Sequence, residues 1–163
     1  MSDLVVLVIE DEPEVRAALV RDLEAAFTTV RVDQAADVDD ALAALAEADD
    51  AGDVVGLILA DHRLPGRSGV DLLVELHERD DTRHIRKVLV TGQADQQDTI
   101  RAVNEAGLDH YIAKPWDPAD LVRVVVDELT DFVVETGLDP LAHMRDLDAA
   151  RLAAAFAARG RPE

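Results

Sequence analysis

The chain has 163 residues, no cysteine and a formal net charge of −19 at pH 7. Its length is typical of one domain with a short appendage, and the lack of cysteine excludes a disulfide framework and a thiolate metal site. The negative charge disfavours binding to nucleic acid and to anionic membrane surfaces. No apolar stretch of the sequence approaches the roughly 20 residues that span a bilayer, and the first residues lack the basic character of a signal peptide. We therefore expect a cytoplasmic protein with no nucleic-acid or membrane partner.

Five short apolar runs predict the strands of a sheet. They are residues 4–9, 30–32, 54–60, 88–90 and 111–113, and a segment with helical periodicity follows each of them. Short apolar runs bounded by turn residues are typical of buried parallel strands. Because strand–helix–strand crossovers are right-handed, the helices should cover both faces of the sheet. The expected fold is α/β, a doubly wound five-stranded parallel sheet of the flavodoxin-like type.

Capping and helix-breaking residues indicate where the later helices begin and end. Ser68 is a suitable N-cap for the third helix, and the fourth should stop near Gly107. Pro118 is placed to open the fifth helix. The main body should end near Val134, and Gly137 then breaks the chain.

Residues 135–163 are expected to form a helical extension. Asp139 and Pro140 suit an N-cap and a first turn, and they predict one alanine-rich helix from about Pro140 to Arg159. The charges from Asp139 onward cancel, so the acidity belongs to the main body. The extension could dimerise, dock on its own body or bind a partner, and its apolar residues favour dimerisation because they need a surface to cover. These residues are Leu141, Met144, Leu152 and Phe156.

Acidic residues follow two of the predicted strands. Glu10 and Asp11 come directly after the first, and Asp61 comes directly after the third. Chemistry in an open parallel sheet gathers at the carboxyl ends of the strands, so these side chains should converge. Three carboxylates in close proximity repel one another, and a divalent cation would relieve the repulsion. Oxygen ligands favour Mg²⁺.

The ends of the fourth and fifth strands offer groups that suit an anion. Thr91 supplies a hydroxyl, and Gly92 lets the backbone approach closely. Lys114 supplies a point charge suited to phosphate, and a cis bond to Pro115 would aim it inward. These parts suit phosphoryl transfer onto a carboxylate, with Asp61 as the nucleophile and with the metal and Lys114 neutralising the phosphoryl oxygens.

With these motifs, the chain resembles the receiver domain of two-component response regulators, the CheY-like family. The resemblance covers about Leu4 to Val134, which makes residues 1–134 the receiver and residues 135–163 the extension. The motifs that carry it are Glu10-Asp11, Asp61 with Leu64-Pro65-Gly66-x-Ser68-Gly69, Thr91-Gly92, and Tyr111-x-x-Lys114-Pro115.

The resemblance implies a role for each residue of the acidic cluster. Asp61 would accept a phosphoryl group from a sensor histidine kinase or a phosphotransfer protein. Glu10, Asp11 and Asp61 would hold Mg²⁺, with Asp11 as a direct ligand and the main-chain carbonyl of Arg63 as a further one. The family is not enzymatic in the usual sense, so we expect only self-catalysed phosphoryl transfer and slow autodephosphorylation.

The resemblance also implies a conformational switch. Thr91 would move toward the phosphoryl group while Tyr111 turns inward, which repacks the face of the fourth and fifth helices. That face would control a homodimer or an unknown protein output. Arg63 and Gln93 stand where the family tunes the lifetime of the aspartyl phosphate.

Other readings are disfavoured by particular residues. A haloacid-dehalogenase-like phosphatase also uses a strand-end aspartate, but it needs a second acid where Arg63 stands. A dinucleotide-binding protein would need a glycine-rich loop after the first strand, where Glu10, Asp11 and Glu12 stand instead. A small transcriptional regulator would need a basic recognition helix, and the segment after Gly137 offers one helix with no net charge.

Overall fold

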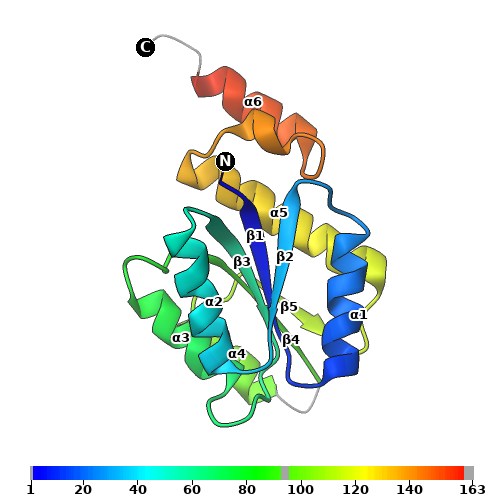
Figure 1. Ribbon diagram of the computed structural model, residues 1–163, viewed down its shortest axis with the longest axis vertical. Helices are drawn as coiled ribbons and strands as arrows, with labels where there is room; N and C mark the ends of the chain where they lie inside the picture. Colours follow the sequence, from blue (N-terminus) through cyan, green and yellow to red (C-terminus); the bar gives the residue numbers. More distant parts are fainter. Residues whose placement is uncertain (1, 93–95, 160–163) are drawn as a thin grey trace.

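The computed structural model describes residues 2–92 and 96–159. They form one parallel sheet between two layers of helices, with the strand order β2-β1-β3-β4-β5 (Figure 1). This is the predicted doubly wound, flavodoxin-like arrangement. The strands are β1 (Leu4–Ile9), β2 (Val30–Ala35), β3 (Val54–Ala60), β4 (Arg86–Thr91) and β5 (His110–Ala113).

Two hydrophobic cores lie on the two faces of the sheet. Helices α1 and α5 cover one face, and α2, α3 and α4 cover the other (Figure 1). Strand β1 is buried along its whole length and alternates its side chains between the two cores. Among the described residues, none of the helices combines the length and apolar character that a membrane span requires. The helices are α1 (Pro13–Glu24), α2 (Val38–Asp50), α3 (Gly69–Glu78), α4 (Gln96–Glu105) and α5 (Pro118–Thr136).

Several predicted boundaries are confirmed by local geometry. The Ser68 hydroxyl accepts a hydrogen bond from the Asp71 N–H and caps α3. Gly137 ends α5 with a left-handed φ of 77°, a conformation that glycine adopts without steric cost. Strand β2 continues to Ala35, beyond the predicted residues 30–32, because the ladder to β1 extends through polar residues at the sheet edge.

The extension is not the single helix that the sequence predicts. A 3₁₀ turn, η2 (Pro140–His143), is followed by a separate helix, α6 (Ala149–Arg159). Between them, Asp146 turns away to accept hydrogen bonds from the loop before β2. The Asp148 carboxylate then accepts from the Arg151 N–H and starts α6. The prediction of one helix from Pro140 to Arg159 is wrong. The chain is bent at Asp146, whose carboxylate is hydrogen-bonded to the loop before β2.

The extension docks on its own receiver at the amino ends of the strands (Figure 1). Leu152 is fully buried and Met144 packs against the core between the sheet and α5. Leu141 and Phe156 remain about half exposed. Half of the apolar face that suggested dimerisation is therefore covered within the chain, and dimerisation through the other half stays a prediction.

Candidate functional site

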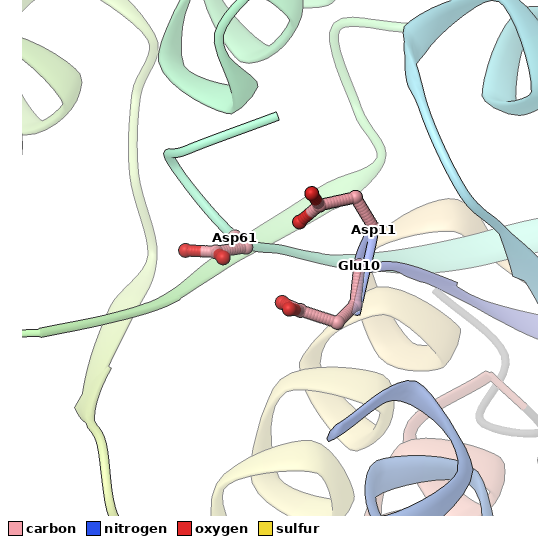
Figure 2. A group of neighbouring side chains, drawn as sticks. All are labelled: Glu10, Asp11 and Asp61. Atoms are coloured by element: carbon pink, nitrogen blue, oxygen red, sulfur yellow. The ribbon is translucent and has the colours of Figure 1, made fainter. Parts of the chain in front are cut away.

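Three carboxylates converge at the carboxyl ends of β1 and β3, which are neighbours in the sheet. Ligand oxygens of Glu10, Asp11 and Asp61 lie within 4.8 Å of one another (Figure 2). Glu10 is fully buried and Asp61 nearly so, whereas Asp11 is exposed. The Asp61 N–H donates to the Ile9 carbonyl, which extends the contact between β1 and β3 to the site itself. The predicted acidic cluster therefore exists as a compact group open to solvent on one side.

The turn after Asp61 fixes the backbone of that residue. The Gly69 N–H donates to the His62 carbonyl at 2.8 Å, so the start of α3 folds back onto the end of β3. A Cβ atom at Gly69 would lie 1.9 Å from the Asp61 carbonyl oxygen. Only glycine fits there. The sequence shows Gly69 as part of a motif, but its contact with Asp61 is visible only in the structure.

Lys114 reaches both buried carboxylates. Its Nζ lies 3.0 Å from Asp61 Oδ2 and 3.1 Å from Glu10 Oε2. The Lys114–Pro115 peptide bond is cis, as predicted, and the Lys114 N–H donates to the Thr91 carbonyl. The side chain thus enters the acidic cluster from β5 and supplies its positive charge.

Burial and charge shift the pKa values of this group. Burial, together with the hydrogen bond and charge of Asp61, raises the pKa of Glu10 to about 7, although Lys114 opposes the shift. Burial alone would lower the pKa of Lys114, but its contacts with Asp61 and Glu10 outweigh burial and raise it. Among the described residues, Glu10 Oε1 has no hydrogen-bond partner although it is buried. A buried carboxylate oxygen without a partner is costly, and a cation would supply the missing partner.

A pocket of about 360 Å³ opens over this cluster. Thr91 and Gly92 form one side of it at the end of β4, and the exposed Arg63 forms another. The structure therefore brings together the predicted nucleophile, metal ligands, hydroxyl and lysine. Glu12 is a lining residue that the sequence did not single out for the pocket. The lining consists of Asp11, Glu12, Asp61, Arg63, Thr91, Gly92 and Lys114.

The predicted switch pair lies on neighbouring strands. Thr91 is buried at the end of β4, and Tyr111 is half buried in β5 against the core beneath α3 and α4. The Tyr111 hydroxyl lies 3.5 Å from the Thr91 carbonyl. The two residues are thus in contact across β4 and β5, and their coupled movement stays a prediction. Gln93, predicted to tune phosphate lifetime, lies outside the described residues.

Two side chains near the site have contacts that sequence reasoning did not predict. The half-buried Trp116, which follows the cis peptide, donates from Nε1 to Asp22 of α1 and packs against the core. His62, in the loop after β3, places Nε2 3.0 Å from Asp98 Oδ2 in α4. A contact between a loop and a distant helix leaves no signal in a single sequence.

Comparisons with known proteins agree with this geometry. A family model described as the response regulator receiver domain matches residues 6–126. The chain is 37% identical to the hydrogenase transcriptional regulatory protein HoxA of Cupriavidus necator over 91% of the chain and 28% of that protein. It is 34% identical to the phosphate regulon transcriptional regulatory protein PhoB of Escherichia coli K12, over 85% of the chain and 61% of that protein. It thus spans less than two thirds of either relative.

Solved structures show the same fold. A response regulator receiver domain protein (CheY-like) from Methanospirillum hungatei superposes with a TM-score of 0.70 at 28% identity, covering 82% of this chain and 99% of that one. Almost all of that chain therefore has a counterpart in this protein, whereas part of this protein has no counterpart there.

Proposed function

The chain belongs to the response regulator receiver domain family of two-component systems, and on that premise we propose that Asp61 accepts a phosphoryl group from a sensor kinase or phosphotransfer protein in a Mg²⁺-dependent reaction. The observation that supports this most is the convergence of Lys114 Nζ and Asp61 Oδ2 at 3.0 Å in an open acidic pocket. Phosphoryl transfer depends chiefly on positioning and charge neutralisation, and this pocket offers both.

The metal ligands are proposed from the acidic cluster. Glu10, Asp11 and Asp61, with the main-chain carbonyl of Arg63, would hold Mg²⁺. The fit rests on the unpartnered Glu10 Oε1 and on a donor set made of oxygen, which suits this ion. When bound, the ion supplies positive charge to the phosphoryl oxygens.

The chain's own side chains account for the rest of the transfer. A carboxylate oxygen of Asp61 forms the bond to phosphorus while the nitrogen–phosphorus bond of the donor histidine breaks. The donor imidazole leaves with the bonding electron pair and takes up a proton. Lys114 neutralises charge on the incoming phosphoryl group, and the Thr91 hydroxyl donates to one of its oxygens. We infer self-catalysed transfer and slow autodephosphorylation, without turnover of a separate substrate.

The output is proposed to follow from Thr91 and Tyr111. A shift of Thr91 toward the phosphoryl group would let Tyr111 repack against α4, whose outer face exposes Ile100 and Val103. This face would meet a second copy of the chain or an unidentified protein output. The relatives HoxA and PhoB are transcriptional regulatory proteins, so control of a further regulatory segment or partner is consistent with them.

The proposal is tested by intact-mass measurement after incubation with acetyl phosphate. The wild-type chain should gain one phosphoryl group only when Mg²⁺ is present. Asp61→Asn should gain none. Asp120→Asn is the matched control, because Asp120 is an exposed acid on α5 that pairs only loosely with Arg123; it should be labelled like the wild type. Full labelling of Asp61→Asn would show that the acceptor lies elsewhere.

A further inference from the structure

Helix α4 is held to the body by few apolar contacts. Ala102 is the one fully buried side chain among the described residues of this helix, and an alanine buries little apolar area. Its larger apolar side chains, Ile100 and Val103, are 46% and 55% exposed. An element with so little buried apolar surface opens easily, so polar contacts have a large share in fixing its position.

An ion pair and a histidine–carboxylate contact tie α4 to the segment that follows Asp61. Arg101 Nη1 lies 2.8 Å from Asp71 Oδ1 in the first turn of α3. His62 Nε2 lies 3.0 Å from Asp98 Oδ2 in the first turn of α4. The His62 side chain is 13% exposed and the Asp98 side chain 44% exposed, so the contact is shielded from solvent on the histidine side alone.

The position of His62 is set by the same turn that sets Asp61. The His62 carbonyl accepts hydrogen bonds from the Gly69 N–H and the Leu64 N–H, and the residue is bonded directly to Asp61. The backbone that carries the ring is therefore part of the phosphoacceptor loop and moves with it. Added negative charge on Asp61 would also repel the carboxylate of Asp98, which weakens the contact between His62 and Asp98.

We propose that His62 is a positioning residue that transmits the phosphorylation state of Asp61 to the first turn of α4 through Asp98. This route acts beside Thr91 and Tyr111, and it rests on the proposed function because it reads the modification of Asp61. In the unmodified protein the contact between His62 and Asp98 keeps α4 packed against the body. When Asp61 is modified, this contact breaks and α4 becomes more mobile. The hydrogen bond needs only an N–H on Nε2, so a neutral or a charged ring can form it.

The first arm of the test uses the unmodified full chain and measures hydrogen exchange at the amides of residues 100–103. His62→Leu and Asp98→Ala should each speed this exchange about threefold, and the double variant should be no faster than either one. His62→Gln keeps a side-chain N–H donor and should stay near the wild type. Additive effects of the two single variants, or no effect of either, would overturn the proposed contact.

The second arm adds acetyl phosphate and Mg²⁺, with the extent of labelling read from intact mass. Wild-type exchange at residues 100–103 should rise, whereas His62→Leu should rise clearly less at the same extent of labelling, because only the route through Thr91 and Tyr111 is left. Arg101→Ala is the matched control: it breaks the ion pair of α4 with Asp71, so its exchange should start faster but still rise. A normal rise in His62→Leu, or a lost rise in Arg101→Ala, would overturn the route.

The two levels of the argument fail separately. If the wild-type mass shows no phosphoryl group, the proposed function fails and this route falls with it. If the chain is labelled but His62→Leu responds like the wild type, only the route through His62 is wrong.

Discussion

Glu10 and Asp146 are buried carboxylates at opposite ends of the same sheet, and they differ in how many hydrogen bonds they accept. Asp146, in the extension, accepts from the main-chain N–H groups of Thr28, Thr29 and Val30 and from both threonine hydroxyls. Glu10, at the carboxyl ends of the strands, keeps one buried oxygen without a partner among the described residues and faces the like charge of Asp61.

The pKa values express this difference. Burial would raise the pKa of Asp146, but its hydrogen bonds to Thr29 and Thr28 outweigh burial and lower it. The pKa of Glu10 is raised to about 7. A carboxylate whose oxygens accept hydrogen bonds from the chain stabilises the fold by itself. A carboxylate with an unpartnered oxygen is stabilised by a group that binds to it. The amino end of the sheet is therefore closed by hydrogen bonds within the chain, and the carboxyl end keeps the open pocket in which we propose that a cation and a phosphoryl group bind.

The largest effect is expected at the open end, from Gly69→Ala. A Cβ there would overlap the Asp61 carbonyl, so the turn must move or the helix must shift, and we expect about 4 kcal/mol of lost stability together with loss of labelling. Urea unfolding and intact mass measure the two. Gly52→Ala is the control at the other end: its φ is 77° but nothing lies within 4 Å of the new Cβ, so only about 1 kcal/mol should be lost. Equal effects at both positions would contradict the account.

Asp146→Ala should have the next largest effect, at the closed end. It leaves several donors of the loop before β2 without their acceptor, and about 3 kcal/mol of stability should be lost. Exchange at α6 amides should rise strongly, while labelling of Asp61 should stay normal. Asp139→Ala is a milder comparison, because Asp139 is an exposed cap of η2. A loss of labelling in Asp146→Ala would show that the two ends are not independent.

The two carboxylates should respond to pH in opposite directions. The lowered pKa of Asp146 adds stability that is present above its unfolded value of about 4 and is lost as pH falls below it. The raised pKa of Glu10 adds stability that is present below its unfolded value and is lost as pH rises toward about 7. Between these limits, metal-free Glu10→Gln should gain about 2 kcal/mol over the wild type near neutral pH. Urea unfolding from pH 4 to pH 8, in the presence of a chelator, measures this; parallel curves for the two proteins would contradict it.

Lys114→Ala should change stability least, by about 1 kcal/mol, because its side chain is partly exposed and its contacts are with groups that a cation can also neutralise. Asp61 should still be labelled, but the modified protein should fail to change its α4 exchange. Lys114→Arg keeps the charge with a different geometry and is the matched comparison. An unaltered α4 response in Lys114→Ala would show that Lys114 does not couple the modification of Asp61 to α4.

The predictable part of the molecule depends on topology. The carboxyl ends of neighbouring parallel strands must share one edge of the sheet, so apolar runs ending in Glu10, Asp61, Thr91 and Lys114 were enough to predict the fold and the convergence of the site. The sequence also showed the caps of α3 and α5, because Ser68 and Gly137 act within a few residues of their own positions.

The parts that could not be predicted depend on contacts between distant segments. Asp146 interrupts the predicted C-terminal helix by accepting a hydrogen bond from Thr28. Because Thr28 lies 118 residues earlier in the chain, no local pattern in the sequence shows this contact. Strand β2 was shortened in the prediction because Asp33 and Gln34 are polar residues at a sheet edge. The His62–Asp98 contact is likewise set by how α3 and α4 pack, and this packing has no local signature.

The central claim is that the open end of the sheet binds a phosphoryl group on Asp61 with the help of a cation. The most direct measurement is ¹⁹F NMR of the full chain with beryllofluoride, a stable mimic of the aspartyl phosphate. Protein-bound fluorine resonances should appear only when Mg²⁺ is added, should persist in Asp146→Ala and should be absent from Asp61→Asn. Bound resonances in Asp61→Asn, or none in the wild type with Mg²⁺, would contradict the account.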